Sequence, residues 1–74
     1  MRVFGKRILE RLDETGMTKD QLMRSTGISA YALRSWISGE RSPNAFNVVI
    51  VSKVLDRSTD WMLGITNKPR RFGQ

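Results

Sequence analysis

The 74-residue sequence contains no cysteine and no histidine. Without cysteine, the chain can form neither a disulfide framework nor a thiolate metal site. Without histidine, it lacks the commonest metal ligand and the usual general base of enzymes. Its carboxylates are scattered rather than paired, and it has no glycine-rich phosphate-binding loop. We therefore expect no catalysis, no metal, no cofactor and no small-molecule ligand.

Long hydrophobic runs are also absent. The longest apolar run, residues 48–51, is far shorter than the ~18 residues that a membrane-spanning helix requires. The basic residues near the N-terminus are not followed by the apolar segment of a signal peptide. These observations predict a cytoplasmic protein that does not associate with membranes.

Acidic residues are few compared with basic ones. The chain has 7 Asp and Glu against 13 Lys and Arg, which gives a net charge of +6. A small domain with such an excess of positive charge favours a polyanion, and nucleic acid in particular, as its partner.

The chain is long enough for a single domain only. We expect residues 1–65 to form this domain and residues 66–74 to form a flexible basic tail. The tail carries Lys68, Arg70 and Arg71 and no acidic residue. A basic arm that contacts phosphate remains an alternative for this segment.

Regularly spaced glycines divide the domain into five short predicted helices. Glycines at positions 16, 27, 39 and 64 each follow a segment with helical apolar spacing, as C-cap glycines do. The predicted helices cover residues 3–15, the segment between Thr18 and Gly27, residues 30–38, the segment from the N-cap Asn44 through Leu55, and residues 59–63. The β-branched residues 48–51 could also form a strand, but their spacing and the capping Asn44 favour a helix. The expected fold is an all-α bundle.

Two of these helices have the spacing of a helix-turn-helix. Residues 19–26 and 30–38 are joined by a turn so short that the helices must cross at a steep angle. Leu22, Leu33 and Trp36 are expected to fill the corner, and Gly27 supplies the positive φ that the turn requires. Ile28 should close the turn on its inner side. This geometry would project the second helix outward.

The outward face of that second helix is predicted to carry Ala30, Tyr31, Arg34, Ser35 and Ser38. No Asp or Glu occurs between Ser29 and Gly39. Small, hydroxyl-bearing and cationic side chains without carboxylates suit a groove that is lined by phosphates. An ordinary solvated helix face is the alternative interpretation.

Residues 4–64 resemble the phage-repressor and Cro type of helix-turn-helix domain, the xenobiotic-response-element class of transcriptional regulators. The matching motifs are Phe4-Gly5-x-Arg7-Ile8, Thr18-x-x-x-Leu22, Gly27-Ile28-Ser29, Leu33-x-x-Trp36-x-x-Gly39, Pro43 and Asp60-Trp61-Met62-Leu63-Gly64. The resemblance implies a compact, lambda-repressor-like bundle of five helices. It also implies a repressor that binds operator sites on double-stranded DNA as a homodimer, in the cytoplasm of a bacterial or phage-infected cell.

The resemblance assigns roles to individual positions. Lys19 occupies a phosphate-contacting position at the start of the second helix. Ser29, Ala30 and Tyr31 occupy the turn that reads base edges in the major groove. Arg34, one turn later, is a candidate for bidentate contact with guanine or for a phosphate clamp. The remaining positions are candidates for contacts with the DNA backbone: Ser35, Arg41, Ser42 and Asn44.

The chain departs from the family pattern at three positions. Met23 stands where alanine is usual, Ile37 replaces a frequent glutamate, and Arg34 replaces a small serine or threonine.

Several apolar residues exceed what a small core requires. Trp36 and Trp61 fall on apolar stripes and are expected in the core. Phe46 and Ile50 lie on the opposite side of their helix from Val51, and Met62 is expected to be exposed with them. This surplus could form a dimer interface or additional core. It also leaves a second hypothesis open, that the domain is an antitoxin or antirepressor that binds another protein.

Overall fold

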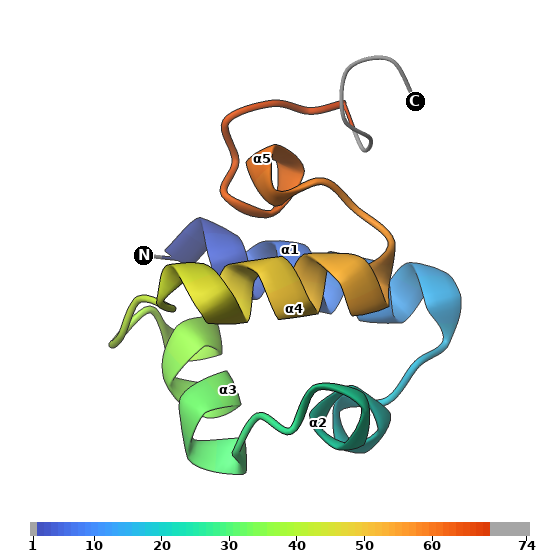
Figure 1. Cartoon of the computed structure of the whole chain (residues 1–74), viewed down its shortest axis with the longest axis vertical. Helices are drawn as coiled ribbons and strands as arrows, with labels where there is room; N and C mark the ends of the chain where they lie inside the picture. Colours follow the sequence, from blue (N-terminus) through green and yellow to red (C-terminus); the bar gives the residue numbers. More distant parts are fainter. Residues whose placement is uncertain (1, 69–74) are drawn as a thin grey trace.

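The computed structural model describes residues 2–68, and these form five helices and no strand (Figure 1). The helices are α1 (Arg2–Thr15), α2 (Lys19–Thr26), α3 (Ala30–Ser38), α4 (Ala45–Leu55) and α5 (Thr59–Met62). This confirms the predicted all-α fold, and the β-branched residues 48–51 lie within α4. Arg70 and Arg71 of the predicted tail lie outside the described residues.

The helices form three levels along the longest axis of the molecule (Figure 1). α1 and α4 lie side by side in the middle, α5 packs on both of them at one end, and α2 and α3 occupy the other end. α3 packs against α1, and α2 packs against α4. The helix-turn-helix is therefore held by the two longest helices and stands apart from α5. None of the helices formed by residues 2–68 is long and apolar enough to cross a membrane.

Side-chain caps fix where the helices begin. Thr18 and Gln21 form a reciprocal capping box at the start of α2, with hydrogen bonds of 3.1 and 2.8 Å. Ser29 and Asn44 cap α3 and α4 by accepting hydrogen bonds from Ala32 N and Asn47 N. Each cap satisfies a backbone N–H that would otherwise lack an intrahelical partner. Because α3 starts at a cap, the side chains of its first turn have a fixed direction.

The core is built around the contact between α1 and α3. The rings of Phe4 and Trp36 meet edge to face, with centroids 5.3 Å apart and an interplanar angle of 74°. Gly5 lies directly against the backbone of α3, so that a Cβ at this position would fall 2.5 Å from Ile37 Cα. Only glycine permits so close an approach of two helix backbones. Gly5 therefore helps to set the position of α3 on the domain.

The remaining core side chains come from all five helices. Leu22, Leu33 and Trp36 fill the corner of the helix-turn-helix, as predicted, and Trp61 is also buried. One other expectation is wrong: Met62, expected at the surface, is fully buried. The single turn of α5 inserts both Trp61 and Met62 against α1 and α4, which helical periodicity cannot predict for so short an element.

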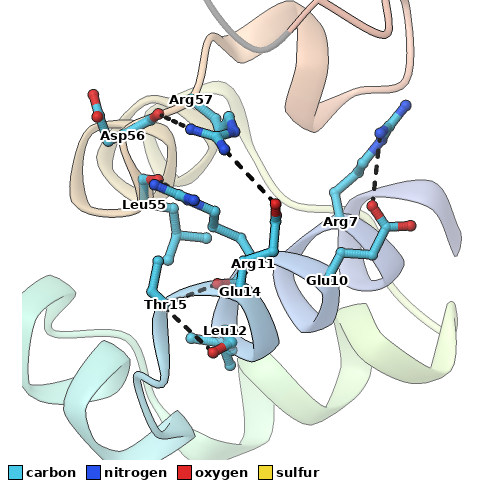
Figure 2. Close-up of polar contacts among 9 residues, drawn as sticks. All are labelled: Arg7, Glu10, Arg11, Leu12, Glu14, Thr15, Leu55, Asp56 and Arg57. Atoms are coloured by element: carbon cyan, nitrogen blue, oxygen red, sulfur yellow. Dashed lines mark hydrogen bonds and ion pairs between the residues drawn. The ribbon is translucent and has the colours of Figure 1, made fainter.

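Polar contacts join α1 to the turn between α4 and α5 (Figure 2). Arg11 Nε donates a 2.7 Å hydrogen bond to the carbonyl oxygen of Leu55. Arg57 NH1 donates to the carbonyl oxygen of Asp56, and its NH2 lies 4.0 Å from Glu14. These two arginines make contacts within the domain, and both lie outside α2 and α3.

Candidate nucleic-acid interface

The turn between α2 and α3 has the geometry that the sequence predicts. Gly27 adopts a left-handed conformation with φ 77°, and its N–H donates to the carbonyl oxygen of Met23. Few residues other than glycine adopt this conformation without strain. Ile28 is half-buried against the core. The chain therefore turns steeply within three residues, so that α3 runs across α2 at the end of the molecule (Figure 1).

The first turns of α3 present their side chains to solvent. Ala30, Tyr31 and Arg34 are exposed, and Tyr31 retains 53% of its accessible surface. Ser29 is exposed as well, although its Oγ accepts the 3.1 Å capping hydrogen bond from Ala32 N. Its hydroxyl proton can still be donated to an acceptor outside the protein.

The predicted placement of Ser35 on this face is wrong. Ser35 is only 2% exposed and lies with Leu33 and Trp36 among the buried residues of α3. Its carbonyl oxygen instead accepts a hydrogen bond from the backbone N–H of Arg41, at 3.2 Å. Ser35 thus anchors the loop after α3, and we do not include it among the candidate contacts.

A shallow hollow between α2 and α3 brings three predicted residues together. Lys19, Ala30 and Arg34 line it, and Lys19 lies at the first position of α2. The hollow is also lined by three apolar residues that were not predicted as site residues: Met23, Leu33 and Ile37. Ala30, Arg34 and Ile37 follow the i, i+4, i+7 spacing of one helix face, so this spacing could have identified Ile37. Met23, Arg34 and Ile37 line this hollow, and they are the three positions at which the chain departs from the family pattern.

The loop after α3 contributes the other predicted residues, and all of them are exposed. The guanidinium carbon of Arg41 lies 5.3 Å from the centroid of the Tyr31 ring, within the range of a cation–π contact. Ser42 is exposed beside it. Asn44 uses its Oδ1 to cap α4 through a 2.8 Å hydrogen bond from Asn47 N, which leaves its side-chain NH2 as a donor.

A family model described as helix-turn-helix matches residues 8–62 of the chain. The chain belongs to this helix-turn-helix family. The match spans all of α2, α3 and α4 and agrees with the phage-repressor and Cro type that the motifs resemble. Searches of curated proteins and of solved structures gave no match.

Membership of the helix-turn-helix family indicates a DNA-binding regulator of transcription, and this family is not typically enzymatic. Among residues 2–68 no group of three or more metal-ligating side chains lies close enough together to hold an ion. The exposed side chains of the candidate interface, among them Lys19, Ser29 and Arg34, supply hydrogen-bond donors and positive charge.

Most acidic residues of this helix-turn-helix domain lie away from α2 and α3. Glu10, Asp13 and Glu14 lie on α1, and Asp56 and Asp60 lie at the turn before α5 and within it. Two acidic residues remain near the candidate interface, Asp20 on α2 and Glu40 in the loop after α3.

The acidic residue on α2 has its own cationic partner. Arg24 NH2 lies 3.2 Å from Asp20 Oδ2, one turn further along the helix. The Asp20 carboxylate is therefore paired with Arg24 and not with the adjacent Lys19. The helix α3 carries no acidic residue. Both features leave the exposed end of the helix-turn-helix with positive charge.

Proposed function

We propose that the protein is a sequence-specific repressor that binds an operator on double-stranded DNA as a homodimer, with α3 in the major groove. The observation that supports this most directly is the exposed face of α3, where Ala30, Tyr31 and Arg34 reach solvent and no carboxylate is present. A carboxylate-free helix of this length can enter the major groove without repulsion from phosphates.

The candidate contacts divide into two groups in this proposal. Ala30 offers a methyl group to a thymine methyl, and Arg34 donates in bidentate fashion to guanine. The residues proposed to contact phosphate or sugar oxygens lie at the margins of the helix-turn-helix: Lys19, Ser29, Arg41, Ser42 and Asn44. Because Ser29 and Asn44 cap helices, the partial positive charges of those two helix N-termini also face the anionic backbone.

A face of α4 supports the proposed homodimer. Phe46 is 70% exposed, Val49 is 41% exposed, and Ile50 is half-buried on the same side of the helix. These three residues form what we call the α4 patch. Three apolar side chains at i, i+3 and i+4 form one surface, which a second copy could cover. A two-fold dimer would place its two α3 helices about 34 Å apart, one turn of DNA.

Repression in this scheme requires only that the bound dimer excludes polymerase from the operator. The protein would act in the cytoplasm. If each subunit neutralises about three or four phosphates, log affinity plotted against log salt should have a slope of about −5 to −7.

Selection of bound duplexes from a random pool tests the proposal. Enrichment of a two-fold symmetric motif, together with the steep salt dependence, is the expected result. A variant with both Lys19→Ala and Arg34→Ala is the comparison: it removes two exposed cations, so it should retain less duplex and lose the preference at the base pair that Arg34 contacts. Failure of the unmodified protein to retain any duplex would contradict the proposal, and binding of a protein partner without DNA would favour the antitoxin or antirepressor hypothesis.

A further inference from the structure

The contact between Arg41 and Tyr31 joins the loop after α3 to the first turn of that helix. The two residues are ten positions apart, and Arg41 follows the C-terminal end of α3. Its guanidinium nevertheless lies 5.3 Å from the Tyr31 ring. A loop arginine therefore reaches back along the recognition helix instead of extending away from it.

The path of the backbone explains this reach. The N–H of Arg41 donates to the carbonyl oxygen of Ser35 at 3.2 Å, which holds the loop against the middle of α3. Ser35 is four residues after Tyr31, a distance of about 6 Å along the helix axis. An arginine side chain spans such a distance when it is extended. The buried Ser35 thus supplies the anchor point from which the Arg41 side chain reaches the first turn.

The guanidinium is held without losing its capacity to donate. A cation–π contact is an attraction between the charge and the ring face and uses none of the guanidinium N–H groups as hydrogen-bond donors. Among residues 2–68 the ion pairs are Arg7–Glu10, Arg24–Asp20 and Arg57–Glu14, so Arg41 is not paired with a carboxylate. Its donors therefore remain available to an anion that approaches α3.

We infer that Tyr31 and Arg41 act as one phosphate-binding unit, in which Tyr31 is a positioning residue for the Arg41 guanidinium. An exposed arginine that is free to rotate loses conformational entropy when it binds. The Tyr31 ring orders the side chain before binding and places its charge beside the turn that enters the groove. This inference rests on the proposed DNA-binding function and assigns Tyr31 a role other than direct reading of a base.

The salt dependence of DNA affinity provides the test, because it counts phosphate contacts. Affinities of the unmodified protein and of four variants are measured on one selected duplex over a series of salt concentrations. Arg41→Ala should reduce the magnitude of the slope by about 0.9 per subunit, the value for one phosphate. Tyr31→Leu removes no charge, yet we expect a similar reduction. The variant with both changes should have the same slope as either single variant.

Tyr31→Phe is the matched control, since it keeps the ring and removes only the hydroxyl. It should retain the slope of the unmodified protein. The free proteins supply a second measurement: the Arg41 side-chain protons should show an upfield NMR shift from the Tyr31 ring in the unmodified protein and in Tyr31→Phe, and lose it in Tyr31→Leu.

Three outcomes distinguish failure of this inference from failure of the proposed function. If the unmodified protein binds duplex with a steep slope and Tyr31→Leu leaves that slope unchanged, the positioning role of Tyr31 is wrong while DNA binding stands. If Tyr31→Phe also reduces the slope, the Tyr31 hydroxyl and not its ring is responsible for the reduction, and the argument from the cation–π contact is overturned. If the unmodified protein binds no duplex, the proposed function itself fails, and the inference fails with it.

Discussion

Arg34 and Lys19 line the same hollow, but they differ in the helix that carries them. Arg34 lies on the exposed face of α3, and Lys19 lies at the start of α2. We predict that Arg34→Ala costs about 1–3 kcal/mol of binding free energy at one base pair and relaxes specificity there. Lys19→Ala should weaken binding to all sequences equally. Gel shifts against a panel of single-base operator variants would measure both, and a uniform loss in Arg34→Ala would assign that residue to a phosphate.

Gly5 lies on α1 and helps to set the position of α3. A methyl group at this position would meet the backbone of α3 at Trp36 and Ile37, which cannot rotate away as a side chain can. Gly5→Ala should therefore lower the free energy of unfolding by about 1–3 kcal/mol despite the better helix propensity of alanine. It should also weaken DNA binding, because α3 must shift to relieve the clash. Urea denaturation and gel shifts would measure the two effects.

Gly16→Ala is the control for this prediction. Gly16 has φ 74°, but an added Cβ there would meet nothing within 4 Å. The substitution should cost about 1–2 kcal/mol through the left-handed backbone alone. DNA affinity, measured where both variants are folded, should be unchanged in Gly16→Ala and reduced in Gly5→Ala. Equal affinities for the two variants would mean that the approach of α1 to α3 does not set the recognition helix.

The N-terminus of α4 combines a structural role with a proposed DNA contact. Asp caps a helix about as well as Asn and favours the helix dipole, so Asn44→Asp should preserve or slightly raise the stability of the domain. Near a phosphate, however, the new charge should cost about 1 kcal/mol, which is about fivefold in affinity at low salt. Asn44→Ala should instead lose about 1 kcal/mol of stability with the cap. Thermal melts paired with gel shifts would check this, and an Asp variant with unaltered affinity would place Asn44 away from DNA.

The five helices were predictable because their boundaries are encoded locally. The helices α2, α3, α4 and α5 each start at a capping side chain, and the four predicted stop glycines all adopt positive φ in the structure. The positions of α3 and α4 follow from Ser29, Gly39 and Asn44 alone. Local signals of this kind do not depend on which elements later pack together.

The faces of the short helices were less predictable. α3 buries residues on more than one side because it packs against α1 and also closes the corner with α2. Ser35 lies at such a contact, and its polarity gives no sign of burial. The cation–π contact between Arg41 and Tyr31 depends on the hydrogen bond from the Arg41 backbone N–H to the carbonyl oxygen of Ser35. No spacing in the sequence reveals this hydrogen bond. The burial of Ser35 and the contact between Arg41 and Tyr31 therefore follow from how the elements pack together, not from local sequence.

At the scale of the whole molecule, the domain has two different ends. The α5 end uses its arginines internally: the Arg7 and Arg57 guanidiniums lie 4.5 and 5.5 Å from the centroid of the Trp61 ring. The α2–α3 end leaves Lys19, Arg34 and Arg41 exposed. Exposed cations beside α3 attract an anionic surface and raise the rate of association with it. These three side chains therefore favour encounters in which α3 faces DNA.

The α4 patch leads to the prediction for the complete assembly. Phe46 is 70% exposed, so replacing it should change the stability of the subunit by no more than about 0.5 kcal/mol. Phe46→Ser should nevertheless weaken self-association, and the slope of log affinity against log salt should fall from about −5 to −7 towards half that value, because a single subunit makes half the phosphate contacts. Sedimentation equilibrium would measure association, and gel shifts would measure the slope.

Ile65 provides a matched control because it is also 70% exposed but lies beyond α5, outside the α4 patch. Ile65→Ser removes an equally exposed apolar side chain and should leave both association and slope as they are in the unmodified protein. If Phe46→Ser associates as strongly as the unmodified protein, the two copies meet elsewhere. If both substitutions weaken association equally, general surface hydrophobicity drives it, and the α4 patch has no specific role in the dimer.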